Sequence, residues 1–393
     1  MPDSPFISPP RGRVLIVGAG FSGAVLARYL AEHAGLASLV IDERPHVAGN
    51  CHTERDEATG VMLHKYGPHI FHTDNEAVWS YIRRFSDIVP YRHRVKATID
   101  RGIFSLPVNL HTLNQFFGKR FGPAEARAFV ASLGDKSSAN PANFEEQALH
   151  LIGPDLYQAF IYGYTKKHWG CEPRELPTSI FSRLPIRFDY DDSYHRSRYS
   201  GIPRDGYTAC IARILDHELV EVKLSTPYEP AMAADFSHVF YTGPLDAWFD
   251  HSLGRLSYRT VFWERIESAG DLQGCSQMNY PQLEVPHTRI HEDKHFTPWE
   301  NHERSVGLVE FAKETAAGDI PYYPKRLAAD KEKLAAYLAL ANAGRGVSFL
   351  GRLATYRYMD MHQVIAEALS FSETWLKAFT TRQPLPVFPA NLS

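Results

Sequence analysis

Hydrophobic residues near the start of the chain follow two different spacings. Residues 13–18, RVLIVG, form a short apolar run that ends in glycine, and residues 19–34 then place apolar side chains at helical spacing. A second short run, ASLVID, covers residues 37–42. The pattern therefore predicts a strand, a tight turn, a helix and a second strand.

Further helices are predicted in the middle and late parts of the chain. Residues 112–120, 123–134 and 327–344 have helical spacing, and the last of these ends at a glycine. Asn143 followed by Glu146 is the capping-box signature of another helix. On one face of that helix lie Tyr157, Phe160, Ile161 and Tyr164.

Residues 93–100 and 238–243 alternate apolar and polar side chains, which predicts strands. We see no internal repeat. Together with the helices, the order predicts an α/β nucleotide-binding domain that is interrupted by helical and mixed-strand insertions.

Composition is that of an ordinary globular protein. The 393 residues are 44% hydrophobic, which is enough for a large core and for two or three domains. The formal net charge of -3 gives no global basic field, so we expect neither nucleic acid nor a membrane surface as a partner. Any anion site must therefore be local.

The start of the chain and the cysteines indicate a location. Residues 1–12 are rich in proline and lack an apolar segment, which favours a disordered leader over a signal peptide. No apolar run reaches the roughly 18 residues of a membrane helix. The four cysteines are far apart, without the spacing of a zinc site or a disulfide framework. They are Cys51, Cys171, Cys210 and Cys275. We expect a cytoplasmic protein.

The turn between the first strand and helix carries a dinucleotide motif. Gly18, Gly20 and Gly23 match GxGxxG, and Asp42 ends the next predicted strand. Alone the glycine motif is weak, and it also fits a turn that only joins a strand to a helix. In this context the helix N-terminus is expected to receive a pyrophosphate, and Asp42 to bind a ribose hydroxyl.

The segment after Asp42 favours FAD over NAD. Arg44 precedes Ala48-Gly49, which resembles the second flavin-contacting stretch of the large FAD family that includes amine oxidases, although the usual glycine pair is Ala-Gly here. Near the C-terminus, Gly351 and Arg352 resemble the late glycine segment that closes the flavin site in this family.

Six longer segments resemble one family, the bacterial UDP-galactopyranose mutases. The match is collinear from about residue 13 to about residue 369. The segments are HKYGPHIFHT (64–73), GYTKKHWG (163–170), LPIRFDYDDSYHRSRYSGIPRDGYT (184–208), VPHTRIHEDKHF (285–296), PYYP (321–324) and YRYMDMHQV (356–364). The resemblance implies conversion of UDP-galactopyranose to UDP-galactofuranose with reduced FAD and no net redox change, N5 of the flavin displacing UDP from the anomeric carbon.

The resemblance also implies a three-part fold and a homodimer. The expected fold class is α/β, with an FAD-binding Rossmann-like domain, a helical insertion with a mobile substrate loop, and an antiparallel β-sheet substrate domain. The expected division is residues 13–88, 207–247 and 344–393 for the FAD domain, 110–178 for the helical domain, and 89–109, 179–206 and 248–343 for the sheet domain.

Site residues follow from the matched positions. For catalysis we expect Arg187 and Arg289, which suit the pyrophosphate because guanidinium binds phosphate in a bidentate manner, together with His69 and His72. Substrate-binding residues are expected to be Tyr164, Trp169, Tyr194, His195, Asn279, Tyr323, Tyr358, Asp360 and Asn109, with Glu310 similarly placed. Cofactor-binding residues are expected to be Gly18, Gly20, Phe21, Ser22, Gly23, Asp42, Glu43, Arg44, Gly49, Asn50, His69, Ile70, Gly351, Arg352 and Met361. For the aromatic residues, packing in a core is the competing interpretation.

The three histidines of residues 64–73 admit several roles. A zinc site built on His69 and His72 lacks further ligands at suitable spacing, so no metal is expected. Within the resemblance, His69 and His72 are expected to face the flavin and the sugar, where an imidazole could tune the reduced flavin near pH 7. His64 is expected to be structural.

Some positions leave the substrate open. His195 stands where the family has phenylalanine, Met359 replaces a tyrosine, and Arg204 and Asp205 stand where smaller residues are usual. Relatives that rearrange UDP-N-acetylgalactosamine or TDP-fucose are therefore alternatives. The FAD fold also supports oxidases, and a non-catalytic nucleotide-sugar-binding protein is a further alternative.

Overall fold

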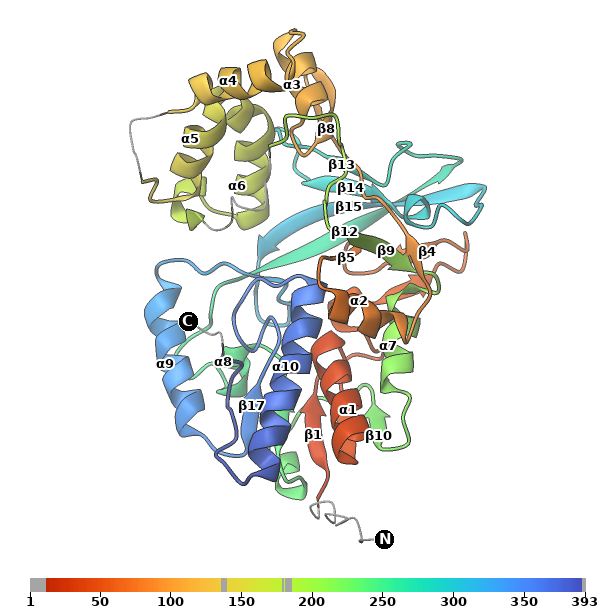
Figure 1. The fold of residues 1–393 in the computed structure, drawn as a ribbon, viewed down its shortest axis with the longest axis vertical. Helices are drawn as coiled ribbons and strands as arrows, with labels where there is room; N and C mark the ends of the chain where they lie inside the picture. Colours follow the sequence, from red (N-terminus) through yellow and green to blue (C-terminus); the bar gives the residue numbers. More distant parts are fainter. Residues whose placement is uncertain (1–11, 136–139, 179, 181–185, 391–393) are drawn as a thin grey trace, which may run out of the picture.

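The computed structural model describes residues 12–135, 140–178, 180 and 186–390. Apart from Gly12, the expected leader lies outside the described residues. The molecule is elongated, with a parallel sheet and its helices at one end and a helical part, α3 (Leu110–Phe117) to α6 (Gly163–Trp169), at the other (Figure 1). No helix in the described part combines the length and the hydropathy that a membrane span requires.

The apolar runs at the start of the chain form the centre of a five-stranded parallel sheet. Its order is β10-β2-β1-β11-β17, and each neighbouring pair is parallel. The strands are β1 (Val14–Val17), β2 (Ser38–Ile41), β10 (Val220–Lys223), β11 (Val239–Tyr241) and β17 (Val347–Phe349). β1 and β2 are covered on both faces, which is why they are continuous apolar runs in the sequence.

Helices cover both faces of this sheet. On one face, α1 (Phe21–Ala34), α7 (Gly206–Leu215) and α10 (Met361–Thr380) pack against alternate residues of the strands. On the other face lie α8 (Leu245–Trp248) and α9 (Asp330–Ala343). The predicted division placed α9 in the sheet domain, but its Tyr337 and Ala341 pack in the core of the parallel sheet. The division is wrong there, because this second apolar face of the sheet also has to be covered.

A second sheet of seven strands has the order β16-β12-β15-β14-β13-β7-β8. Its neighbouring pairs are antiparallel except β13 and β7, which are parallel. The strands are β7 (Val95–Ile99), β8 (Gly102–Leu106), β12 (Tyr258–Ala269), β13 (Gln277–Asn279), β14 (Arg289–Glu292), β15 (Arg304–Glu314) and β16 (Tyr323–Pro324).

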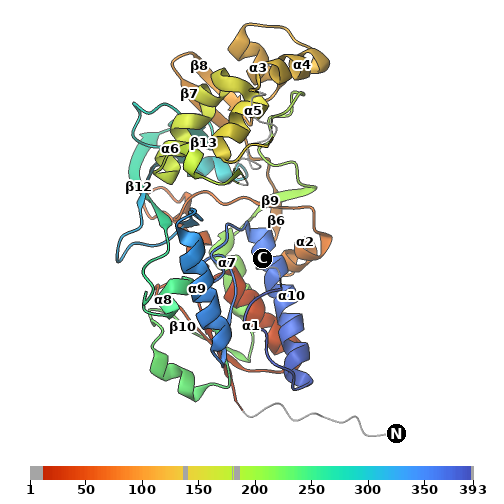
Figure 2. The same ribbon diagram turned by 90° about the vertical axis from the view of Figure 1, so that its left-hand side faces the viewer.

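The helical part packs on the β7–β8 end of the second sheet, as Figure 2 shows from the side. It also contains α4 (Pro123–Leu133) and α5 (Phe144–Leu156), and α5 begins as predicted, with the Asn143 side chain accepting a bond from the Glu146 N–H. Residues Tyr157–Tyr162 form a π-helix rather than a continuous α-helix. The predicted apolar face survives, since Tyr157, Phe160 and Ile161 are buried.

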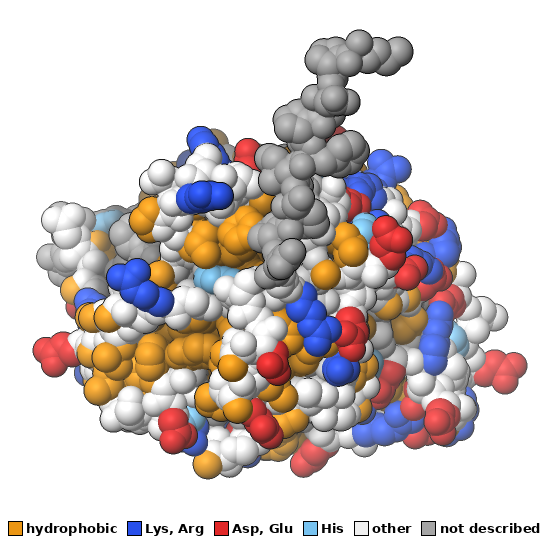
Figure 3. All heavy atoms as spheres, turned by 90° about the horizontal axis from the view of Figure 1, so that it is seen from below, with side chains coloured by type: hydrophobic (Ala, Val, Ile, Leu, Met, Phe, Trp, Pro, Cys, Tyr) orange, Lys and Arg blue, Asp and Glu red, His pale blue; other side chains and the backbone are white. Residues whose placement is uncertain are grey.

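Smaller elements connect the two sheets. β5 (Phe71–Thr73), β9 (Tyr199–Pro203) and β6 (Ile88–Pro90) form a three-stranded sheet, and β3 (Thr53–Arg55) pairs with β4 (Met62–His64). α2 (Glu76–Arg83) follows β5. Short 3₁₀ helices cover Gly49–Cys51, Pro173–Glu175, Pro230–Asp235 and Asp293–Phe296. The surface at the parallel-sheet end carries basic and acidic side chains side by side, which agrees with the small net charge (Figure 3).

Candidate active site

One large cavity lies between the parallel sheet, the helical part and the seven-stranded sheet. Its volume is about 1850 Å³, whereas a pocket for one small ligand is typically about 300–1,000 Å³. The lining runs from the glycine turn after β1 to Tyr164 of α6 and Arg289 of β14. The cavity therefore has room for a dinucleotide and a second ligand.

The glycine turn needs glycine for reasons of space. A Cβ on Gly18 would lie 2.0 Å from Thr242 Oγ1, and a Cβ on Gly23 would lie 2.0 Å from the Gly18 carbonyl oxygen. Gly18 also has a φ of 109°. At the N-terminus of α1 no side chain caps the helix. This end of the cavity therefore offers free backbone N–H groups to a pyrophosphate, and Gly23 acts by letting the helix start close to the turn.

Asp42 lies at the same end of the sheet and lines the cavity. Its carboxylate accepts bonds from the backbone N–H groups of Ala19, at 2.8 Å, and Arg44, at 3.0 Å. Two oxygens have about four acceptor positions, so a ribose hydroxyl can still be bound. The predicted neighbours Phe21, Ser22, Glu43, Arg44, Gly49, Asn50, His69, Ile70, Arg352 and Met361 also line the cavity.

Gly351 contributes in another way. It does not line the cavity, but a Cβ there would lie 2.4 Å from Ser22 Oγ, and its φ is 85°. The late glycine segment therefore approaches the start of α1 closely, as expected for a segment that closes the dinucleotide site.

Strand β11 provides a further part of the cavity wall that was not predicted from the sequence. Thr242 and Gly243 follow β11 directly and line the cavity, and the Thr242 hydroxyl donates to the Val17 carbonyl at 2.8 Å. A signal was present, because ligands bind at the carboxyl ends of parallel strands and this predicted strand ends in Thr-Gly.

Arg289 forms a buried ion pair with Glu310, a partner that the sequence alone did not identify. Its Nε and Nη2 both donate to Glu310 Oε2, at 2.8 and 2.6 Å, and Glu310 is fully buried. Burial opposes charge on both groups. The neighbouring guanidinium nevertheless lowers the pKa of Glu310, and the carboxylate raises the pKa of Arg289. Arg289 is thus held rigidly at the cavity wall while Glu310 stays behind it.

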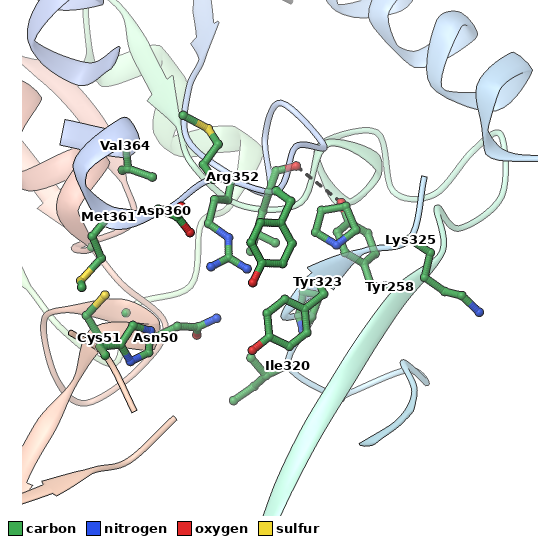
Figure 4. Close-up of a pocket in the computed structure, with 18 of the residues that line it drawn as sticks. Asn50, Cys51, Tyr258, Ile320, Tyr323, Lys325, Arg352, Asp360, Met361 and Val364 are labelled. Atoms are coloured by element: carbon green, nitrogen blue, oxygen red, sulfur yellow. Dashed lines mark hydrogen bonds between the residues drawn. The ribbon is translucent and has the colours of Figure 1, made fainter. Parts of the chain in front are cut away.

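Aromatic residues form the wall beside Arg289. The Tyr323 and Tyr358 rings stack with centroids 5.5 Å apart, and the Arg352 guanidinium lies 5.5 and 5.2 Å from them. Figure 4 shows Arg352 and Tyr323 pointing toward each other in the cavity. Arg352 also donates to the Tyr322 carbonyl at 2.6 Å. It therefore connects the part of the cavity at the glycine turn, which the preceding Gly351 approaches, with the part lined by Tyr323 and Tyr358.

Helix α6 contributes Tyr164 and Trp169 to the cavity lining, together with His168, which was not predicted from the sequence. The Tyr164 and His168 rings stack at 6.0 Å, and His168 lies 4.9 Å from Tyr323. Burial lowers the pKa of His168 to about 4, so the imidazole is neutral. Tyr194, Asn279 and Asp360 line the same cavity.

Arg187 lines the cavity, but its guanidinium group forms hydrogen bonds to backbone carbonyl groups. It donates to the carbonyl oxygens of Asp191, Ser193 and Tyr194, and only 5% of the side chain is exposed. The guanidinium shapes the turn that carries Tyr194. Its contact with a pyrophosphate stays a prediction.

Asn109 does not belong to the site. It is fully buried and absent from the cavity lining. Its side chain caps α3 by accepting from the Thr112 N–H at 3.1 Å, and it donates to the Pro107 carbonyl at 3.2 Å. The prediction of a sugar contact is wrong because the side chain is fully buried away from the cavity, where its oxygen caps α3 and its nitrogen binds the Pro107 carbonyl.

The three histidines of residues 64–73 separate as follows. His64 is buried, and its Nδ1 accepts from the His69 N–H at 3.2 Å, which agrees with a structural role. His69 Nδ1 donates to the Gly67 carbonyl at 2.7 Å. Burial lowers the pKa of His69 to about 3, which favours a neutral imidazole near pH 7.

His72 lies in a group of stacked imidazoles. Its ring is 3.7 Å from that of His195 and nearly parallel to it, and its Nδ1 bonds the Ser197 hydroxyl at 3.0 Å. His72, Asp360 and His362 bring possible metal ligand atoms within 4.8 Å of one another, a group that the sequence did not reveal. The expectation that no metal binds stays a prediction.

Comparison with known proteins gives consistent matches. A family model described as UDP-galactopyranose mutase matches residues 159–358, and one described as an NAD(P)-binding Rossmann-like domain matches residues 16–85. A Klebsiella pneumoniae protein named "Probable UDP-galactopyranose mutase" is 50% identical over 375 residues, covering 95% of this chain and 97% of its own length. A dTDP-fucopyranose mutase from Escherichia coli is 46% identical over 372 residues, covering 93% and 98%.

A solved structure agrees with the fold. The crystal structure of a reduced UDP-galactopyranose mutase has a TM-score of 0.73 and covers 96% of this chain and 99% of its own. Its identity of 13% supports the fold alone. The α/β prediction with a Rossmann-like domain and a largely antiparallel second sheet is confirmed. On its sequence identity and coverage, this chain belongs to the UDP-galactopyranose mutase family.

Proposed function

We propose that this enzyme interconverts UDP-galactopyranose and UDP-galactofuranose, with FAD in its reduced form as the cofactor. The observation that carries the proposal is that one cavity is continuous from the glycine turn to Arg289, Tyr323 and Tyr358. A dinucleotide at one end and a nucleotide sugar at the other would then meet inside one space.

The residues present fit FAD. The turn at Gly18 leaves no room for a side chain, α1 presents uncapped N–H groups, and Asp42 can accept a ribose hydroxyl. Arg44 and Asn50 also line the cavity. When bound, reduced FAD would supply the nucleophilic N5 that the anomeric carbon requires, without net redox change.

The role of the protein residues is to stabilise the negative charge that UDP gains when the anomeric bond breaks. Arg289 and Arg352 are fixed cations in the cavity wall, one held by Glu310 and the other by the Tyr322 carbonyl. Groups that are already oriented stabilise developing charge without reorganisation. The Tyr323 and Tyr358 rings exclude water beside them, and their hydroxyls can donate to phosphate.

His69 and His72 are proposed to face the flavin and the sugar. With Nδ1 bonded to Gly67, the neutral His69 leaves Nε2 as an acceptor. It can therefore receive a hydrogen bond from a sugar hydroxyl or from a flavin N–H, while His72 is held in place by Ser197 and His195.

A related nucleotide sugar is the second candidate. The E. coli relative acts on a dTDP sugar, as its name states. The His195 ring stacks on the ring of His72 rather than on the aromatic residues of α6. It therefore places a second imidazole beside the residue that we propose to face the sugar. This position would influence which hydroxyl pattern the pocket accepts.

The test is direct. Dithionite-reduced enzyme is incubated separately with UDP-galactofuranose, its N-acetylamino counterpart and dTDP-fucofuranose, and pyranose formation is followed by chromatography. We expect fastest turnover of UDP-galactofuranose, with no oxygen consumed per turnover. Faster turnover of either of the other two sugars would identify that sugar as the substrate in place of UDP-galactofuranose. If flavin-loaded enzyme converts none of the three, the proposal is refuted.

We further propose that the enzyme is a homodimer, because the family resemblance implies one. We also propose that it is cytoplasmic, because all four cysteines are free thiols. Sedimentation velocity would test the dimer. Fractionation of the native cells would test the location.

A further inference from the structure

Lys167 makes a cluster of bonds that the reaction does not explain. It lies on α6, next to the cavity residue His168, and its side chain is partly buried. The ammonium donates to four backbone carbonyl oxygens, those of Tyr280 at 2.6 Å and of Gln282, Val285 and His287, each at 2.8 Å. All four belong to the loop of residues 280–288 between β13 and β14.

This loop depends on an outside donor. It contains Pro281 and Pro286, which have no N–H, so it cannot pair its own carbonyls fully. Four carbonyl dipoles point at one place, where they would repel one another without a cation. An ammonium has only three N–H groups, so the four acceptors share them. Lys167 therefore holds these four carbonyl groups of the loop together.

Helix α6 is itself fixed against the rest of the site. A Cβ on Gly163 would lie 2.2 Å from the Pro281 carbonyl oxygen, so the start of the helix touches the loop directly. At the other end, Arg259 donates to the carbonyl oxygens of His168, at 2.8 Å, and Lys167, at 3.0 Å. The helix is a firm support from which Lys167 reaches the loop.

Both ends of the loop carry cavity residues. Asn279 comes directly before it and Arg289 directly after it, and Tyr164, His168 and Trp169 face the same cavity from α6. We propose that Lys167 is a positioning residue for nucleotide recognition. It holds Asn279 and Arg289 against the aromatic face of α6, so that both walls contact the same nucleotide. The inference rests on the proposed function, since it assumes that a UDP sugar occupies this end.

The experiment measures UDP binding to oxidised, flavin-loaded enzyme by calorimetry. Lys167→Met keeps the side-chain length and removes every donor. Lys166→Met is the matched control, because Lys166 is a neighbour on the same helix that pairs with Glu172 and does not line the cavity. We expect the dissociation constant for UDP to rise about tenfold in Lys167→Met, the loss of roughly one charged hydrogen bond, and to be unchanged in Lys166→Met.

A double-mutant cycle separates positioning from general loss of stability. Asn279→Ala should weaken UDP binding in the wild-type background but have little further effect in Lys167→Met, because the amide is already displaced. Flavin content should stay at the wild-type level in both. Equal UDP affinity of Lys167→Met and wild type, or fully additive losses, would overturn the inference. Failure of the wild-type enzyme to bind UDP would instead refute the proposed function.

Discussion

The ion pair between Arg289 and Glu310 gives the sharpest quantitative prediction. Arg289→Met removes both guanidinium bonds to Glu310, at 2.8 and 2.6 Å. Among the described residues, the Thr288 hydroxyl at 3.0 Å is then the remaining donor to this fully buried carboxylate. Breaking a buried pair by removing one partner costs about 3–5 kcal/mol. Since a domain is stable by only about 5–15 kcal/mol, this loss is large.

The double variant Arg289→Met/Glu310→Gln tests the cause. The glutamine amide that replaces the carboxylate is neutral and can still accept from the Thr288 hydroxyl, so the double variant should recover at least about 2 kcal/mol of the loss in Arg289→Met. Urea unfolding followed by circular dichroism measures each free energy of unfolding. Arg204→Met is the control, because its pair with Asp87 is exposed and should be worth less than about 1 kcal/mol.

Turnover distinguishes the structural role from the chemical one. Arg289→Met and the double variant should both lose at least about tenfold in kcat/KM, because both lack the phosphate donor. Glu310→Gln should lose less than either, since the guanidinium is retained. A double variant as unstable as Arg289→Met would refute the account of the buried carboxylate, and undiminished turnover would refute the contact with UDP.

Three other changes have clear expected outcomes. His72→Ala should lower turnover while leaving UDP affinity, measured by calorimetry, nearly unchanged, because we propose that His72 faces the flavin and the sugar rather than UDP. Gly23→Ala should yield protein with little bound flavin in its absorbance spectrum, since the new Cβ would lie 2.0 Å from the Gly18 carbonyl oxygen. His238 does not line the cavity, and burial lowers its pKa to about 4. The wild type should therefore lose stability as the pH falls from about 6.5 toward 4, because the unfolded chain binds the proton first. His238→Gln should reduce the stability difference between pH 7.5 and 5.0 by up to about 2 kcal/mol, as measured by urea unfolding.

The dinucleotide end of the site could be predicted because its geometry is local. Gly18, Gly20 and Asp42 lie within one strand-turn-helix-strand unit, and their spacing fixes where the turn and the strand end meet. The prediction of a sugar contact for Asn109 failed for a local reason that the sequence also contains. Asparagine directly before a helical segment is a strong N-cap, and Thr112, which donates to it, is three residues later.

The substrate end depends on pairings between distant segments. Arg289 meets Glu310 because β14 and β15 are antiparallel with these two residues opposite each other. His72 meets His362 because β5 packs near the start of α10. No periodicity in the sequence specifies either register. Lys167 was likewise hidden, since its partners are backbone carbonyls, which leave no trace in residue types.

The turn at Gly67 lies in the histidine segment, residues 64–73, beside the ion pair of Arg289 with Glu310. Its carbonyl oxygen takes the His69 Nδ1–H, and a Cβ there would lie 3.7 Å from Arg289 Nη2, so the histidine segment passes directly beside the ion pair. Burial lowers the pKa of His69 and His195 to about 3. Both imidazoles are therefore neutral from pH 5 to 8, while the arginine remains charged. In the proposed site, the positive charge that would face UDP thus comes from guanidinium groups, and we expect a pH effect on turnover in that range to originate elsewhere than in these two histidines.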